Sequence, residues 1–397
     1  MAVRAFRRHF QTSSIVREKK KYERDTERSF LNIGTLGGYQ HGKTSLASCL
    51  TKHSSLTNPP IPSKTVAEID SGKNELANKH TENPTHLEVA TERFHAALTD
   101  LPGNMSFVKN LLNHLFHLDA VLLVVRAEEG VLEETKLFYK FARHVGIDNV
   151  IPVINYSDAA EVEESADLIK MELSEAFDEE GDTKSIGNVV VGNFADPKEN
   201  EIKNLVSAID LIEVPSRKDG EPLVWPLENV GSIPNRGTFI AGRILAGEAK
   251  VGSAIDVFYN GNVSKANVRD CEVFRRSTTD LKAGERGGAF VKLKVDPFDL
   301  KRGGVAFDRA KTDRMIGSEW KIELKDEFLA SESTLIKSLV AFHDTSASSQ
   351  SDLELESVGG SSGVLKTKSP ILVGQNQPLV IRSTNGFLRA NFVRQIK

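Results

Sequence analysis

Residues 37–45, GGYQHGKTS, constrain the fold more than any other stretch of the chain. They match the phosphate-loop pattern Gly-x-x-x-x-Gly-Lys-Thr at every required position. The strand-like run SFLNIGT precedes them and a helical pattern follows, which is the context that this motif requires. Glycines let backbone N–H groups curl around a phosphate, Lys43 reaches its oxygens, and Thr44 offers a hydroxyl to Mg²⁺. The stretch therefore predicts a nucleotide phosphate site between a strand and a helix.

Short apolar runs alternate with amphipathic stretches from residue 29 to about residue 212, which is typical of a parallel sheet covered by helices. The expected strands are SFLNIGT, LEVA, FHAALTD, AVLLVV, NVIPVIN and NVVVGN. The expected helices span residues 43–53, 105–117, 132–145, 161–177 and 198–212. This pattern predicts one α/β domain.

The composition changes after Val214. Residues 223–310 are rich in glycine and carry short alternating runs, GTFIAGRI, AIDVFYNG and GAFVKLKV, which predict a small antiparallel barrel. Residues 318–397 again contain strand-like pieces, WKIEL, LIKSLVAF, PLVIRS and RANFVRQI. The polar stretch TSASSQSDLELESVGGSSG interrupts them and is expected to be a mobile loop. The predicted division is a tail at 1–29, the α/β domain at 30–213, one barrel at 214–315 and a diverged, shortened barrel at 316–397.

Length and composition exclude several classes of protein. A chain of 397 residues is too long for one ordinary domain. The longest apolar run, AVLLVV, is far too short to span a membrane, so no membrane partner is expected. The only two cysteines, Cys49 and Cys271, permit neither a disulfide framework nor a Cys-x-x-Cys metal site, which favours a reducing compartment.

The N-terminal residues are basic, although the whole chain carries a net charge of −4. The first 17 residues, MAVRAFRRHFQTSSIVR, have four arginines, several hydroxyls and no acid, as mitochondrial presequences do. Within them RRHFQTS resembles the Arg-x-Phe-x-x-Ser processing pattern. The alternative is a basic tail that contacts RNA.

Two later motifs supply what nucleotide chemistry at a phosphate loop requires. Asp100 and Gly103, in DLPG, follow a predicted strand, where a carboxylate holds the water shell of Mg²⁺ and a glycine N–H senses the γ-phosphate. Asn155 and Asp158, in NYSD, follow another strand, where a base-reading loop is expected. A carboxylate there accepts hydrogen bonds from N1 and N2 of guanine, a pair that adenine lacks. The motifs together favour a guanine nucleotide.

The residues that carry these motifs resemble elongation factor Tu over most of the chain. The likeness includes NIGT, HGKTSL, DLPG with FVKN, AVLLVVRAEEG and RGTFIAGRILAGEAKVG. It implies an α/β P-loop GTPase domain followed by two small antiparallel β-barrel domains, with GTP or GDP and Mg²⁺ as cofactors. It also implies aminoacyl-tRNA, the ribosome and an exchange factor of the elongation factor Ts type as partners. The expected function is GTP-dependent delivery of aminoacyl-tRNA to the ribosome of the mitochondrial matrix.

The resemblance assigns site residues by position. It implies that one set contacts the nucleotide: Gly37, His41, Gly42, Lys43, Thr44, Ser45, Asp100, Gly103, Asn155 and Asp158. An ungapped count back from DLPG puts Thr81 where the switch threonine of the family binds Mg²⁺ beside Thr44. Lys109 and Asn110 match positions that meet the 5′ end of tRNA, although Lys109 also fits a solvated helix position.

Some positions depart from the family pattern. Asn104 stands where the family has the histidine that orients the attacking water. Because such groups contribute about 10² to 10⁴ in rate, hydrolysis is expected to be slow. Tyr39 replaces a small apolar residue of the phosphate loop, and Tyr156 replaces a lysine that packs over guanine, so its ring is expected to stack on the base. The last segment has no counterpart of the family's Gly-Arg-His-Thr-Pro stretch.

Two other interpretations stay open. A degenerate paralogue would bind guanine nucleotide with weak hydrolysis and act as a binding or regulatory module. A P-loop ATPase unrelated to translation would prefer ATP. The histidines predict no metal site, because His114 and His117 lie three residues apart on one expected helix without a third ligand. Trp225 and Trp320 are expected in the cores.

Overall fold

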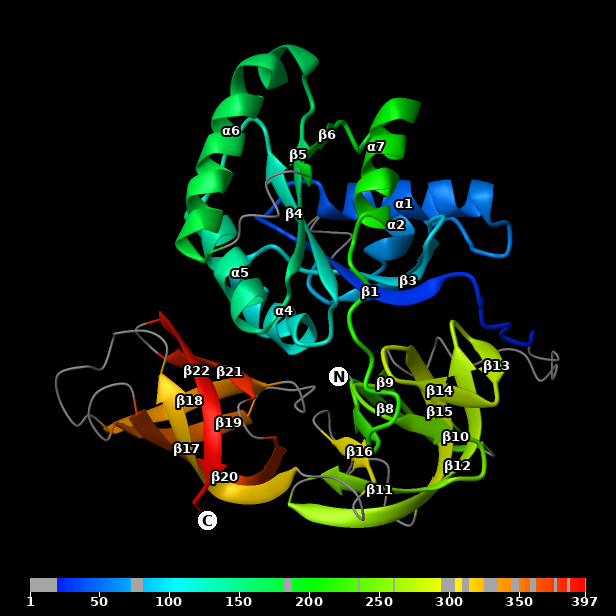
Figure 1. Cartoon of the computed structure of the whole chain (residues 1–397), viewed down its shortest axis with the longest axis vertical. Helices are drawn as coiled ribbons and strands as arrows, with labels where there is room; N and C mark the ends of the chain where they lie inside the picture. The colour runs from blue at the N-terminus through cyan, green and yellow to red at the C-terminus, as the bar shows by residue number, and fades with distance from the viewer. Residues whose placement is uncertain are drawn as a thin grey trace.

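The computed structural model divides into an α/β domain and two β-domains (Figure 1). It describes residues 20–72, 81–181, 188–233, 236–259, 261–293, 304–308, 314–324, 335–343, 350–357, 362–374, 377–383 and 386–396. The proposed presequence, residues 1–17, lies outside the described residues. None of the helices in these ranges has the length and apolar character needed to cross a lipid bilayer.

The α/β domain is built on a six-stranded sheet of order β2-β3-β1-β4-β5-β6. Edge strand β2 is antiparallel to β3, and the other strand pairs are parallel. The strands are β1 (Ser29–Leu36), β2 (Thr85–Ala90), β3 (Phe94–Asp100), β4 (Ala120–Arg126), β5 (Asn149–Asn155) and β6 (Val190–Gly192). All six strands were expected. Because parallel strands end at one edge of the sheet, β1, β3 and β5 bring their following loops together.

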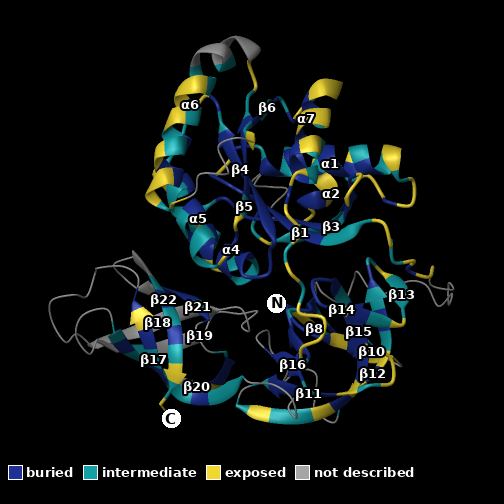
Figure 2. Ribbon diagram, viewed as in Figure 1, coloured by how far each residue is buried: buried dark blue, intermediate teal, exposed yellow. Residues whose placement is uncertain are grey.

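Helices cover this sheet, and two apolar clusters fill the space between sheet and helices (Figure 2). They are α1 (Lys43–Thr57), α2 (Val66–Ile69), the 3₁₀ turn η2 (Met105–Phe107), α4 (Val108–Leu115), α5 (Glu133–His144), α6 (Ala159–Glu179) and α7 (Glu199–Asp210). The expected helices are all present, except that the one at 105–117 divides into η2 and α4. Short helix α2 was not expected, although Thr65 and Glu68 form the capping box that marks its start.

The second domain is a curved antiparallel sheet around the buried Trp225. Its strands are β7 (Val224–Pro226), β8 (Asn229–Ile233), β9 (Gly237–Arg243), β11 (Ala254–Tyr259), β12 (Asn262–Val273), β13 (Arg276–Thr278), β15 (Arg286–Leu293) and β16 (Val305–Phe307), with a separate pair β10 (Glu248–Lys250) and β14 (Asp280–Lys282). Part of the expected tail packs on it. Tyr22 is 4% exposed in its core, and Arg24 pairs with Asp280 and Glu285.

The third domain is a closed barrel of order β17-β20-β19-β18-β21-β22 around the buried Trp320. Its strands are β17 (Met315–Leu324), β18 (Leu335–His343), β19 (Gln350–Ser357), β20 (Ser362–Val373), β21 (Pro378–Ser383) and β22 (Gly386–Gln395). The expectation of a polar loop was wrong at β19. Leu353 and Leu355 alternate with acidic residues there, and Leu355 is fully buried. Alternation of apolar and polar residues with a period of two is typical of a β-strand.

The α/β domain and the second domain meet at the buried carboxylate of Asp119, just before β4. It accepts hydrogen bonds from the backbone and side chain of Asn32 at 2.8 and 2.9 Å and from Arg217 at 2.8 and 3.0 Å. Arg243, at the end of β9, also donates to it. Although burial opposes ionisation, Arg243 and Arg217 lower the pKa of Asp119 to about 2. One carboxylate thus holds two domains and the segment between them.

We expect Asp119→Asn to lower the free energy of unfolding by about 3 to 5 kcal/mol, because it leaves the buried Arg243 and the half-buried Arg217 without their carboxylate. Urea unfolding followed by tryptophan fluorescence measures this change. The control is Asp148→Asn, an exposed partner of Arg143, for which less than about 1 kcal/mol is expected. Since the folded pKa of Asp119 lies below the usual value of about 3.9, its contribution is complete above that pH and is lost as pH falls toward 2. Equal losses in both variants would contradict this role.

Candidate functional site

The loop between β1 and α1 approaches its neighbours so closely that two positions require glycine. Gly37 has φ 142° and Gly42 has φ 89°. A Cβ on Gly37 would lie 2.1 Å from the Val124 carbonyl oxygen, and one on Gly42 would lie 2.2 Å from Asn155 Nδ2. Gln40 also has a left-handed backbone, with φ 58°. The loop therefore adopts a strained, fixed curve that ends at the N-terminus of α1, where free N–H groups favour anions.

Lys43, the first residue of α1, points back into this curve. Its Nζ donates to the Gly38 carbonyl oxygen at 2.6 Å, and the side chain is buried. Gly103, after β3, also borders the ammonium group, because a Cβ there would lie 2.1 Å from Lys43 Nζ. Burial lowers the pKa of Lys43 to about 8, although the carboxylates of Asp100 and Asp70 raise it. The loop thus holds a desolvated amino group that an anionic ligand would favour in its charged form.

Four oxygen-bearing side chains gather beside Lys43. Thr44 Oγ1 donates to Asp100 Oδ2 at 2.8 Å and lies 3.1 Å from Thr81 Oγ1. Thr81 Oγ1 donates to Asp70 Oδ1 at 2.9 Å. Hydroxyl and carboxylate oxygens are the donors that Mg²⁺ prefers, so the cluster fits this cation. The structure places Thr81 beside Thr44, as the count from DLPG predicted.

Asp100 is the fully buried acid of this cluster. Burial raises the pKa of Asp100 to about 6, although hydrogen bonds from Thr35 and Thr44 and the charge of Lys43 lower it. The pKa of Lys43 is lowered and the pKa of Asp100 is raised, so the charged form of each residue is disfavoured. A phosphate beside Lys43 and a divalent cation beside Asp100 would reverse both shifts, because each supplies the opposite charge.

Asn155, at the end of β5, connects three segments. Its Nδ2 donates to the His41 carbonyl oxygen at 3.0 Å, and its Oδ1 accepts from the Phe194 N–H at 3.1 Å. Asn193 Oδ1 accepts from the backbone of Ala195 at 3.2 Å, which shapes the turn after β6. The segment at the end of β6, residues 192–195, therefore supports Asn155, a role that the sequence did not reveal. Asn155 fixes the phosphate loop relative to the loop expected to read the base.

The loop after Asn155 is ordered by two acids outside the motif. Ser157 donates to Glu128 through its N–H, at 2.8 Å, and through its hydroxyl. Tyr156 Oη donates to Glu201 Oε1 at 2.6 Å, and its ring packs beside an apolar core cluster. Asp158 is exposed directly before α6. Stacking of Tyr156 on a base stays a prediction.

Asn104 caps the turn that follows DLPG. Its Oδ1 accepts from the Ser106 N–H at 2.9 Å at the start of η2, so this oxygen already has a partner. Tyr39 is exposed in the phosphate loop, and Gln40 Nε2 donates to its hydroxyl at 3.2 Å. The two substituted positions thus lie in the loops that border Lys43, and neither offers a group that is charged near neutral pH.

Other predicted residues are placed away from the oxygen cluster. His41 is fully buried, with Nδ1 3.1 Å from the Val124 carbonyl oxygen, and its backbone rather than its ring meets Asn155. Ser45 is half-buried in the first turn of α1. Asn110 Nδ2 donates to the Glu82 carbonyl oxygen at 2.8 Å, which ties the segment after Thr81 to α4. Lys109 is exposed on that helix.

Asp70 is the member of the cluster that sequence reasoning missed. It is the C-cap of α2 and is 9% exposed. The capping box of Thr65 and Glu68 was the available signal for that helix. The sequence could not show that the helix ends beside Thr81, because this contact joins segments on either side of a long connection.

We expect nucleotide binding to take up a proton at alkaline pH, because phosphate favours the charged form of Lys43. With a pKa of about 8, Lys43 is mostly neutral at pH 8.5, so binding of GDP with Mg²⁺ should take up roughly 0.8 proton. Calorimetry in two buffers of different ionisation enthalpy measures this uptake. Lys52→Ala removes an exposed lysine of α1 and should leave it unchanged. A binding heat independent of the buffer at pH 8.5 would contradict the depressed pKa.

Comparisons with known proteins agree with this geometry. Residues 28–220 match the family model of the elongation factor Tu GTP binding domain. Bacterial selenocysteine-specific elongation factor EF-Sec has a similar structure, with a TM-score of 0.76 and 20% sequence identity over 92% of this chain and 58% of that chain. This chain thus spans little more than half the length of that protein.

Translation elongation factor SelB from Methanococcus maripaludis is also similar. Its complex with the GTP analogue GppNHp has a TM-score of 0.72 and 18% identity over 94% of this chain and 81% of that chain. Its apo form has a TM-score of 0.70 and 18% identity over 94% and 80% of the two chains. These likenesses establish the three-domain fold: an α/β domain followed by two antiparallel β-domains. The first domain, residues 28–220, thus matches the elongation factor Tu GTP binding domain, and the likeness to the solved structures is one of fold.

Proposed function

We propose that this chain is a translational GTPase of the elongation factor Tu type that binds GTP with Mg²⁺ and carries aminoacyl-tRNA to the mitochondrial ribosome. The observation that carries the proposal is the gathering of Thr44, Thr81, Asp70 and Asp100 beside the desolvated Lys43. Such a site suits a triphosphate with a divalent cation better than any uncharged ligand. The match of residues 28–220 supports guanosine as its nucleoside.

Each group of the site has a task in this proposal. Lys43 neutralises the β- and γ-phosphate oxygens, and the N–H groups at the start of α1 bind the phosphates. Thr44 and Thr81 would hold Mg²⁺ directly, with Asp100 and Asp70 behind them. When bound, the cation neutralises charge that develops on the phosphate oxygens. Gly103 is close enough to Lys43 for its N–H to sense the γ-phosphate.

Base selection is assigned to Asp158. Its exposed carboxylate lies three residues after Asn155, in the loop between β5 and α6. Accepting from N1 and N2 of guanine would discriminate strongly against adenine, because adenine offers no matching donors. The Glu128 and Glu201 contacts keep this loop ordered before the base arrives.

Slow hydrolysis follows from Asn104. A neutral amide whose oxygen caps η2 can orient a water only through its Nδ2, and it cannot carry the charge of an imidazolium. The GTP-bound state should therefore persist. This also favours the second candidate, a paralogue that holds guanine nucleotide and acts as a binding or regulatory module.

The partners and the compartment belong to the same proposal. The basic, acid-free first 17 residues support import into the mitochondrial matrix. An exchange factor of the elongation factor Ts type would release GDP. The α/β domain and the two β-domains together would hold the acceptor end of the tRNA.

We expect the GTP form to protect the ester bond of aminoacyl-tRNA from spontaneous hydrolysis at micromolar protein concentration. Release of a radioactive amino acid over time measures protection in the presence of GTP, GDP or ATP. Protection with GTP alone supports the carrier function. GTP binding without protection would favour the regulatory paralogue, and preferential ATP binding would overturn the assignment to translation.

We expect Asn104→His to raise ribosome-stimulated GTP hydrolysis by up to about 10² to 10⁴, because it restores a group that positions the water. Single-turnover release of phosphate on mitochondrial ribosomes measures the rate. Asn104→Gln is the matched control, since it keeps the amide and should give no gain. If the histidine variant hydrolyses GTP no faster than the wild type, the deficiency lies elsewhere.

A further inference from the structure

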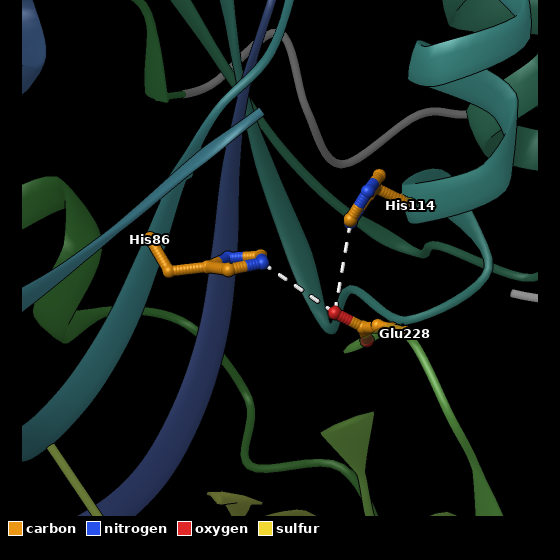
Figure 3. A group of neighbouring side chains, drawn as sticks. All are labelled: His86, His114 and Glu228. Atoms are coloured by element: carbon orange, nitrogen blue, oxygen red, sulfur yellow. Dashed lines mark ion pairs between the residues drawn. The ribbon is translucent and has the colours of Figure 1, made fainter. Parts of the chain in front are cut away.

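Three side chains that are far apart in the sequence converge at the interface of the α/β domain and the second domain. His86 comes from β2, His114 from the last turn of α4, and Glu228 from the residue before β8. Figure 3 shows both imidazole rings directed toward the carboxylate. Glu228 Oε2 lies 3.4 Å from His86 Nε2 and 3.7 Å from His114 Nδ1. The three ligand-type atoms all lie within 4.8 Å of one another.

Two buried atoms of this cluster lack a hydrogen-bond partner among the described residues. Neither His114 Nδ1 nor Glu228 Oε1 has one among the described residues, although both atoms are buried. His86 differs, because its Nδ1 lies 3.0 Å from Thr99 Oγ1. If Nδ1–H donates to that hydroxyl, the lone pair of Nε2 faces Glu228. Acceptor atoms directed at one another favour a cation between them, and His114 Nδ1 is the atom of the three that no donor reaches among the described residues.

We propose that His86, His114 and Glu228 bind Zn²⁺ and join the two domains. Two histidines and one glutamate are a known ligand set for zinc, with a fourth position open to water. Ligand atoms around a tetrahedral zinc with bonds of about 2.1 Å lie about 3.4 Å apart. The two measured separations from Glu228 are close to this value. An ion can reach the site, because the His86 side chain is 27% exposed.

Arg286 is the competing cation. Its Nη1 contacts Glu228 Oε2 and lies 3.3 Å from His86 Nε2, so it occupies part of the space between the proposed ligands. Zinc therefore requires Arg286 to move, and the partnerless Glu228 Oε1 offers it a new acceptor. The retained positive charge weakens zinc binding. Because of this competition, substitution of Arg286 should change the Zn²⁺ affinity in the opposite direction to substitution of a ligand.

Zinc at this site would connect the two domains through bonds that do not involve the nucleotide. Glu228 and Arg286 belong to the second domain, whereas both histidines belong to the α/β domain. Zinc bound to all three ligands replaces an ion pair within the second domain by bonds that cross the interface. It should therefore stabilise the docked arrangement of the two domains.

The experiment uses the full chain, treated with a chelator and then dialysed into excess Mg²⁺ to saturate the oxygen cluster near Thr44. Titration with Co²⁺ should produce the intense visible absorption of a four-coordinate site, and Zn²⁺ should abolish it at one equivalent. His86→Gln, His114→Gln and Glu228→Gln should each weaken Zn²⁺ binding by about 100-fold or more, since even supporting contacts contribute 10- to 100-fold. His53→Gln, on α1, is the control and should bind as the wild type does.

Arg286→Gln separates a metal site from a purely structural cluster. For a metal site, removing the competing charge should tighten Zn²⁺ binding, whereas loss of folding would weaken it. Circular dichroism of each variant excludes unfolding as the cause of lost binding. Zn²⁺ should also raise the unfolding temperature of the wild type and the His53→Gln variant but not of the ligand variants. Absence of the cobalt spectrum, or equal Zn²⁺ affinity in the ligand variants and the control, would overturn the proposal.

Discussion

Two desolvated groups of opposite charge, Lys43 and Asp100, form the centre of the candidate site at the carboxyl ends of the parallel strands. Burial disfavours the ammonium form of Lys43 and the carboxylate form of Asp100, so a ligand of opposite charge would favour the charged form of each. The surrounding fold holds them there. Gly37 and Gly42 let the loop curve tightly, and Gly103 leaves room for the Lys43 ammonium. A triphosphate with a divalent cation is the ligand class that compensates both charges at once.

The interface between the first two domains follows the same physical rule. Asp119 and Glu228 are buried carboxylates whose ionised forms depend on arginines within hydrogen-bond reach. Such pairs contribute little net stability compared with apolar packing, but breaking one leaves a costly unpaired charge. They therefore determine the relative orientation of the docked domains more than the stability of the docked state. Asp119 joins the domains directly, whereas Glu228 is paired by Arg286 of its own domain and only approached by the histidines.

Periodicity and the phosphate loop predicted the sheet, its helices and the central site residues, because these signals are local. The count back from DLPG assigned Thr81 to Mg²⁺, and the structure places it beside Thr44, while its role at the metal stays a prediction. Asp70 was missed because helix α2 is only four residues long, and β19 was missed because its acidic residues hid the alternation of its leucines. The His86–His114–Glu228 cluster could not be predicted, since tertiary packing alone brings its three segments together.

The same two segments reach both the oxygen cluster and the interdomain histidines. From Thr81 the chain enters β2 and arrives at His86 after five residues, and from Gly103 it passes through η2 and α4 to His114 after eleven. Residues 81–84 precede β2, and η2 separates Gly103 from α4, so each connection is only partly regular. A nucleotide that displaces Thr81 or Gly103 would act on segments that carry the proposed zinc ligands. Coupling between the two sites would further require Glu228 to exchange between Arg286 and the proposed metal, because a coupled element needs two discrete arrangements.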